Sequence, residues 1–153
     1  MKKELQNQLK EKYQILYPEF DKTKRYNDPI LDWGIECGDG WFMILDKIMS
    51  WLKFQHLTNG YPKIKIVQIK EKFGMLSFYY ENPKFEDSDF KDRQKFNENL
   101  SLIRGAVSFA TSLSIEICEK CGSTHNVKRT DGNWIRFYCE SCRIEEAKIK
   151  NHQ

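Results

Sequence analysis

Residues 118–142 read CEKCGSTHNVKRTDGNWIRFYCESC, and this stretch decides the fold of the C-terminal part of the chain. It holds two C-x-x-C pairs, Cys118 with Cys121 and Cys139 with Cys142. Each C-x-x-C turn can present two sulfurs to one metal ion, and a hairpin between the turns closes the site. The spacing therefore predicts a zinc ribbon in which both pairs bind one Zn²⁺.

The residues between the pairs predict the hairpin. Two strand-like runs, 127–130 and 133–138, flank the dipeptide Asp131-Gly132, which is a strong hairpin signal. The charged tail, residues 143–153, is expected to form a helical turn that frays.

The predicted role of the zinc ion is structural. Four thiolates complete a tetrahedral shell and leave no open coordination position for catalysis. His125 is an alternative ligand because it follows Cys121 closely, although an exposed loop histidine is the commoner outcome. The sequence contains no H-x-E, C-x-E or H-E-x-x-H motif, so the deaminase and zincin patterns are absent. We assign no catalytic residues, and the motifs favour a protein without enzymatic activity.

Composition places the chain among globular proteins. Its 153 residues are 40% hydrophobic and 14% aromatic, and the formal net charge is +3, too weak to indicate nucleic acid by itself. The charged N-terminus predicts no signal peptide, and no apolar run approaches the roughly 20 residues that span a bilayer. We expect a cytoplasmic protein with no membrane association.

In a reducing compartment, paired cysteines favour metal binding over disulfides, and Cys37 is expected to be a partly buried free thiol.

Upstream of the ribbon, hydrophobic periodicity predicts two helices around a loop. Residues 2–17 have the period of an amphipathic helix, and residues 20–40 are rich in turn formers. Asp39 is placed to cap a second helix that begins near Trp41 and ends before Asn59-Gly60.

The period then changes to that of strands and returns to that of a helix. Residues 63–71 and 75–81 predict a β-hairpin with its turn around residues 72–74. The acidic stretch 86–89 is expected to open a long helix that runs to about residue 112. The predicted fold class is α+β, with a core domain over residues 1–114 and a zinc ribbon over residues 115–153 that packs on it.

Two short polar segments are candidates for binding. The first is Glu36–Trp41, in which Glu36 and Asp39 would accept hydrogen bonds while Trp33 or Trp41 would stack on a planar ring. The alternative is a tight turn that leads into a helix.

The second polar segment is Lys70–Gly74, in which Lys70 and Lys72 would face a phosphate or an acidic partner. The alternative is a solvated turn. Sequence alone leaves open whether this segment and Glu36–Trp41 form one site.

The segments ECGDGW, QIKEKFGMLSFYY, CEKCG, GNWIRFYC and ESC together resemble a group of small uncharacterised proteins found largely in bacteriophage and prophage genomes. The similarity covers most of residues 30–143. It implies a phage-type accessory protein that acts in the cytoplasm of a bacterial host and binds a host factor. It implies no catalytic role for any residue.

Three functions follow from these observations. The first is a zinc-stabilised, non-catalytic accessory protein that binds another protein, for example a host defence component. The second is DNA or RNA binding, with Trp134, Phe137 and Tyr138 stacking on bases beside the basic residues of the ribbon. The third is binding of a nucleotide-like ligand at the ECGDGW loop. We favour the first, because the metal site is closed and no catalytic set stands out. The sequence does not define the oligomeric state.

Overall fold

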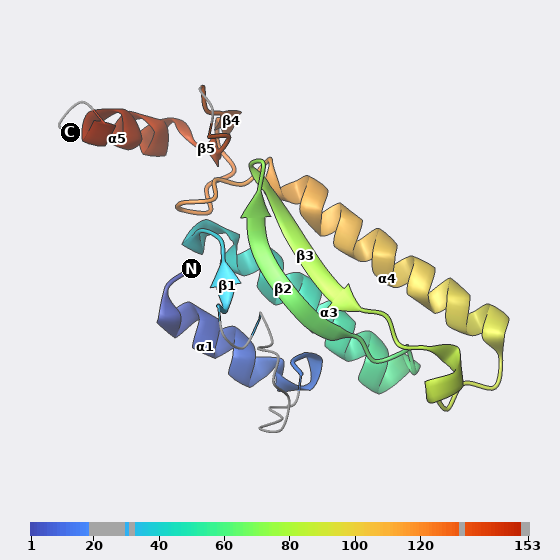
Figure 1. The fold of residues 1–153 in the computed structure, drawn as a ribbon. Coiled ribbons are helices and arrows are strands. Elements are labelled where there is room, and N and C mark those ends of the chain that lie inside the picture. The colour runs from blue at the N-terminus through green and yellow to red at the C-terminus, as the bar shows by residue number, and fades with distance from the viewer. Residues whose placement is uncertain (19–29, 31–32, 132–133, 151–153) are drawn as a thin grey trace.

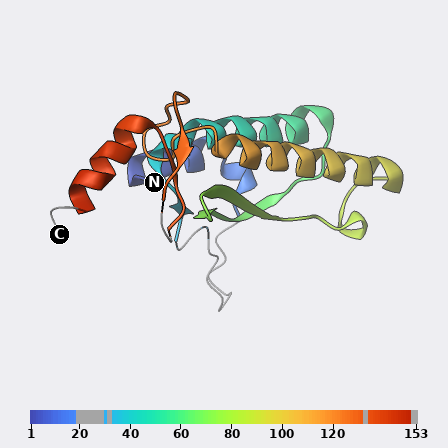
Figure 2. The same cartoon turned by 90° about the horizontal axis from the view of Figure 1, so that it is seen from above.

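A computed structural model describes residues 1–18, 30, 33–131 and 134–150, and its architecture is α+β, as the sequence predicts (Figure 1). The loop predicted over residues 20–40 lies largely outside the described residues, as does part of the predicted 131–132 turn. In the described part, helices α3 and α4 lie side by side on one face of a three-stranded sheet, and the ribbon stands at one end (Figures 1 and 2).

The N-terminal segment packs against the start of the fold. Helix α1 spans Lys3–Lys12 and is followed by a short 3-10 turn at Gln14–Leu16, so the predicted helix is interrupted at Tyr13. The Tyr13 hydroxyl donates to the Asp46 carboxylate at 2.6 Å, and the Lys12 ammonium donates to the same carboxylate at 2.7 Å. These bonds tie α1 to α3.

The sheet has the order β1-β2-β3 and mixes two kinds of pairing. Strands β2 (Lys65–Lys72) and β3 (Met75–Glu81) form the predicted antiparallel hairpin. Strand β1 (Ile35–Glu36), which the sequence analysis did not predict, pairs in parallel with β2. Its register sets Glu36 beside Lys70, so the two polar segments lie on neighbouring strands.

Helix α3 spans Phe42–Asn59 and ends at Gly60, whose φ of +65° suits a left-handed cap. A 3-10 turn at Asp39–Trp41 leads into it, but Asp39 does not cap it. The predicted N-cap is therefore wrong. The Asp39 carboxylate instead accepts from the Lys2 amide at 2.7 Å, because the N-terminus lies across the loop.

Helix α4 spans Arg93–Ser114 and begins later than predicted. The acidic stretch does not open it. Residues Phe85–Asp87 form a separate 3-10 turn, and Asp92 caps α4 by accepting from the Lys95 amide at 3.1 Å.

The main core lies between the sheet and the helices. It contains buried side chains of α1, α3, α4, all three strands of this sheet and the turns beside them. The largest include Trp41, Tyr13, Leu45, Met49, Ile66, Ile69, Leu76 and Ile103.

The ribbon has a second, smaller cluster made of Cys118, Cys139 and Cys142, with Val127 and Tyr138 packed against it. Strands β4 (Lys128–Arg129) and β5 (Phe137–Tyr138) form the expected hairpin in shortened form. Helix α5 (Glu140–Lys150) replaces the predicted fraying turn. The division between residues 114 and 115 stays a prediction.

Candidate metal centre

The four predicted ligands come together in the ribbon. The Sγ atoms of Cys118, Cys121, Cys139 and Cys142 all lie within 4.8 Å of one another, and those of Cys121 and Cys139 are 3.6 Å apart. Metal–thiolate bonds of about 2.3 Å in a tetrahedron separate the sulfurs by about 3.8 Å. The cluster therefore has the donor atoms and the size to bind a metal ion.

The backbone positions the first pair through a tight turn. The Gly122 amide donates to the Cys118 carbonyl at 2.8 Å, and the Cys118 amide donates to the Ser123 carbonyl at 2.8 Å. Gly122 has a φ of +80°, a conformation that a residue with a Cβ adopts at a cost. The turn directs both thiols to one side.

The second pair joins a strand to a helix. Cys139 directly follows β5, and Cys142 lies in the first turn of α5. The Ser141 hydroxyl lies 3.2 Å from the Cys139 sulfur. Hydrogen bonds from this hydroxyl and from the Cys142 amide lower the pKa of the Cys139 thiol to about 6. Burial and the neighbouring thiols raise the pKa of Cys142. A bound cation would favour the thiolate at every position.

His125 does not join the cluster. It is exposed, and its backbone amide donates to the Ser123 hydroxyl at 3.1 Å. Cys37 is also separate, since it lies in the main core and is only 6% exposed. Burial raises the pKa of the Cys37 thiol to about 12. The prediction of a free thiol at Cys37 is confirmed, and the residue is more deeply buried than the partial burial expected.

The ECGDGW loop packs directly on the first pair of cysteines. The Gly40 amide donates to the Glu119 carbonyl at 2.8 Å, and the Trp41 indole donates to the Ile117 carbonyl at 3.0 Å. A Cβ on Gly40 would lie 2.1 Å from the Cys118 carbonyl oxygen, and one on Gly38 would lie 2.2 Å from the Glu119 carbonyl oxygen. Both glycines are needed because two backbones touch here.

The KEKFG turn packs on the other side of the ribbon. A Cβ on Gly74 would lie 2.8 Å from Ile135 and 2.9 Å from Phe137. The Glu71 carboxylate accepts from the Gly74 amide at 2.6 Å and also pairs with the Arg136 guanidinium. The turn of the β2–β3 hairpin is therefore part of the surface against which the ribbon packs.

Glu119 joins the two contacts. Its side chain is almost fully buried, and its carboxylate accepts from the Gly38 amide at 3.0 Å and lies 3.5 Å from the Arg136 guanidinium. Burial raises the pKa of Glu119, although Arg136 and the Gly38 amide oppose that rise. The two polar segments thus meet the ribbon at one buried network, Glu119–Arg136–Glu71.

Sequence reasoning missed the members of this network. Neither Glu119 nor Arg136 was singled out from the sequence. A local signal existed for Arg136, which alternates with Ile135 and Phe137 along a strand. No local signal marks Glu119, because its partners Gly38 and Arg136 are distant in sequence.

The residues predicted to bind a small ligand do not share one pocket surface. Trp41 is completely buried, so its ring has no open face for stacking, whereas Trp33 is 70% exposed. Asp39 is engaged by Lys2, and Glu36 accepts from the Gln68 amide group at 3.2 Å.

Lys70 and Lys72 each lie over an aromatic ring of the hairpin, at 5.6 Å from Tyr79 and 5.5 Å from Phe73. Ligand binding by Glu36, Asp39 and the two lysines stays a prediction.

Comparisons with known proteins add no relative. No protein-family model, curated protein or solved structure matches this chain. Among the described residues, none of the helices combines the length and the apolar character that crossing a membrane requires.

Proposed function

We propose that the chain is a zinc-stabilised, non-catalytic binding protein whose α3–α4 face takes up a helix of a partner protein. The observation that carries the proposal is a second apolar stripe on α4. The side chains that α4 turns to the core occupy one stripe, among them Ile103, Val107 and Ala110. Leu102, Ala106, Phe109 and Leu113 form another, outside the core cluster of buried residues, although Ala106 packs against that cluster.

The second stripe has the spacing of a helix–helix seam. Steps of four, three and four residues separate its members, as in the a and d positions of a heptad. Leu102 is 54% exposed and Phe109 is 66% exposed. In a solvent-exposed helix face these apolar side chains contribute no stability, whereas a second helix packed on the stripe would bury them.

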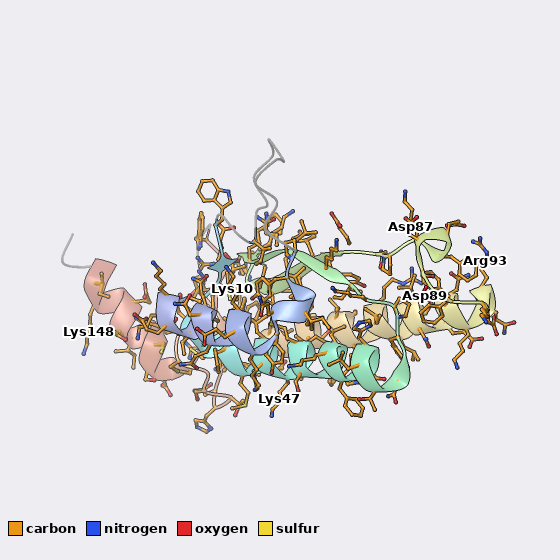
Figure 3. All side chains as sticks on the ribbon, turned by 90° about the horizontal axis from the view of Figure 1, so that it is seen from below. Lys10, Lys47, Asp87, Asp89, Arg93 and Lys148 are labelled. Atoms are coloured by element: carbon orange, nitrogen blue, oxygen red, sulfur yellow. The ribbon has the colours of Figure 1, made fainter. Side chains whose placement is uncertain are left out.

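Helix α3 completes a groove. The space between α3 and α4 measures about 440 Å³ and is lined by apolar side chains of both helices, including Met43, Trp51, Phe109 and Leu113. Lys47 is the single charged residue in this lining. Figure 3 shows Lys47 on the side of α3 that is turned away from the sheet. Within the described residues Lys47 forms no ion pair, so its charge is available to a partner.

These features fit an amphipathic helix of a partner protein with an acidic residue that reaches Lys47. Helix-in-groove recognition uses apolar anchors at i, i+3, i+4 and i+7, which match the seam on α4. The resemblance to phage-type proteins supports a host protein, such as a defence component, as the partner.

The metal is assigned to Zn²⁺ by chemistry. Four cysteine donors in a reducing compartment favour zinc or an iron–sulfur centre over hard cations. The ribbon topology of two C-x-x-C turns around a hairpin favours zinc. Elemental analysis of purified protein should give about one Zn²⁺ per chain, and Cys118→Ser should lower that content. Iron in its place, or no bound metal, would contradict the assignment.

The partner is tested by capture with matched variants. Immobilised protein is incubated with a lysate of the bacterial host, and Phe109→Glu is compared with Leu57→Glu, which changes an exposed α3 residue outside the groove. We expect a stoichiometric protein that the wild type and Leu57→Glu retain and that Phe109→Glu loses by at least about tenfold. A zero-length carbodiimide cross-link from Lys47 to an Asp or Glu of that protein should place its helix in the groove.

Two outcomes would overturn the assignment of this face. Retention of the partner by Phe109→Glu would place the interface elsewhere. A dimer of the chain that Phe109→Glu dissociates in light scattering would show that a second copy, not another protein, covers the groove.

A further inference from the structure

The exposed apolar side chains of the described residues are not confined to the groove face. Those on α3 and α4 belong mostly to the groove face. Three exposed aromatic residues lie on the other elements that meet at the ribbon: Phe73 is 72% exposed, Tyr79 is 42% exposed and Trp134 is 71% exposed. The proposed partner helix uses none of them.

A cation lies over each of these three rings. The Lys70 ammonium is 5.6 Å from the centre of the Tyr79 ring, and the Lys72 ammonium is 5.5 Å from that of Phe73. The Arg136 guanidinium lies 5.3 Å from the centre of the Trp134 ring. We call these six residues the hairpin–ribbon surface.

The hairpin and the ribbon hold this surface together. Strand register pairs Lys70 with Ser77, and Gln68 with Tyr79, so Lys70 and Tyr79 are diagonal neighbours on one face of the sheet. The opposite face carries the buried Ile69 and Leu76 of the core. At the hairpin tip Gly74 touches the ribbon, and Figures 1 and 2 both place β4 and β5 beside that tip.

The backbone at the tip is unusual. Phe73 has a φ of +54°, in the left-handed region that glycine or asparagine normally occupies. Its ring is not used by the core, because it is largely exposed. Strained positions of this kind concentrate at functional sites, where the strain presents a side chain outward.

The charge of the surface favours an anionic ligand. Within the described residues Lys70 and Lys72 make no ion pair, and neither does Lys65 farther along β2. Two acids lie nearby: Glu36 lies next to Lys70 and is held by Gln68, and Glu81 lies opposite Lys65 across the hairpin. Arg136 is neutralised by Glu71 and Glu119, so it contributes a planar stacking group more than a free charge.

We propose that the hairpin–ribbon surface binds single-stranded nucleic acid, with bases stacked on Phe73, Trp134 and Tyr79 and phosphates beside Lys70 and Lys72. Alternating aromatic platforms and cations are what a single strand needs, because every base has a π-face and every linkage carries a negative charge. A protein partner would not need a free cation beside each ring of the hairpin.

The site differs from the one that the sequence predicted on the ribbon alone. Of the three ribbon aromatics considered there, only Trp134 is exposed, while Phe137 and Tyr138 are half-buried in the β4–β5 pair. The sheet supplies the remaining platforms.

The test is fluorescence anisotropy with labelled oligouridine, oligodeoxythymidine and a DNA duplex of equal length. We expect both single strands to bind and the duplex to bind more weakly; a preference between the two single strands would assign RNA or DNA. Phe73→Ala and Trp134→Ala should each weaken binding by about 5- to 100-fold. If the two phosphates beside Lys70 and Lys72 are neutralised, log K should fall with log salt with a slope of about −1.4.

A matched variant outside the hairpin–ribbon surface serves as the control. Phe54→Ala removes a ring that is 52% exposed on α3 and should leave binding unchanged. Lys70→Glu should weaken it. Thermal melts should show that all variants fold, since the rings replaced are exposed. No binding of either single strand at low salt would overturn the proposal, and so would binding that both aromatic variants retain. Neither result depends on the partner captured through Phe109.

Discussion

Gly38 and Gly40 have ordinary backbone angles, so their role is not conformational freedom. Each sits where a Cβ would collide with a backbone carbonyl of the segment that carries Cys118 and Glu119. Backbone atoms cannot rotate away as side chains do, so the contact excludes any larger residue. Gly38 and Gly40 therefore mark the place where the ECGDGW loop packs on the turn that carries Cys118 and Glu119.

Gly40→Ala should destabilise the protein by about 1–3 kcal/mol, the usual cost of adding a methyl group to a packed contact. Urea unfolding followed by tryptophan fluorescence measures the change. Gly105→Ala is the control, because a Cβ there meets nothing within 4 Å and the residue lies inside α4. We expect Gly105→Ala to stabilise the fold by about 0.5–1 kcal/mol. Equal effects of the two substitutions would contradict the argument from close contact.

Phe73→Asn should stabilise the protein. The left-handed backbone of Phe73 costs about 1–2 kcal/mol for a residue with a bulky Cβ substituent, and asparagine tolerates this region better. We expect a gain of about 1 kcal/mol in unfolding free energy, together with weaker single-strand binding. A variant that is less stable than the wild type would show that the Phe73 ring contributes to packing.

At the scale of elements, the buried Glu119–Arg136–Glu71 network joins the ribbon to both polar segments. Side-chain exposure is 6% for Glu119, 24% for Arg136 and 11% for Glu71. A buried carboxylate that loses its cation is costly because water cannot replace the lost partner.

Arg136→Met should therefore cost about 3 kcal/mol, which urea unfolding would measure. Lys120→Met is the control. It removes an ion pair with Glu145 and Glu146, whose side chains are 61% and 36% exposed, and should cost no more than about 1 kcal/mol. A smaller loss for Arg136→Met than for the control would mean that the network is not what holds the ribbon.

The link between α1 and α3 predicts a pH dependence. Burial alone would raise the pKa of Asp46, but hydrogen bonds from Lys12 and Tyr13 outweigh it and hold that pKa below its ordinary value. The ionised form is thus favoured in the folded state. Its stabilising effect is present above the unfolded pKa and is lost as the pH falls through the folded pKa. The difference in unfolding free energy between wild type and Asp46→Asn, about 1 kcal/mol near neutral pH, should shrink by about pH 3. A difference that grows on acidification would contradict this sign.

Elements whose signals are local could be predicted, and contacts between distant elements could not. The β2–β3 hairpin, α3, α4 and the cysteine cluster follow from periodicity, turn residues and C-x-x-C spacing. The two-residue strand β1 has no such signal, because it exists only through pairing with β2. Asp39 satisfied the local rule for an N-cap, but Lys2 competes for its carboxylate across the fold. The ECGDGW loop was predicted either to bind a ligand or to form a turn before a helix; the structure has a 3-10 turn there, and its glycines pack on the ribbon.

At the scale of the whole molecule, the residues that the structure describes form two apolar clusters with no buried residue in common. The larger extends from Leu9 to Ala110, and the smaller consists of three cysteines and two flanking side chains. So small a cluster buries too little apolar surface to fold the ribbon without metal. The main core does not need a metal to fold, because the sheet, α3 and α4 bury one another's apolar side chains.

Removal of the metal should therefore unfold the ribbon and leave the main core folded. In hydrogen exchange after chelation, the amides of β4 and β5 should lose protection while those of β2 and of α4 around Ile103 keep it.

Thiol titration offers a second readout of the same metal removal. Without metal, the four ribbon cysteines should react with a disulfide reagent while Cys37, which is 6% exposed and whose pKa burial raises to about 12, should react only after denaturant is added. A single transition that exposes all five cysteines at once would mean that the ribbon and the core fold as one unit. In that case the contacts of Gly40 with Glu119 and of Trp41 with Ile117 would couple the two parts. Separate transitions would instead support the boundary predicted between residues 114 and 115, with the metal stabilising only the ribbon.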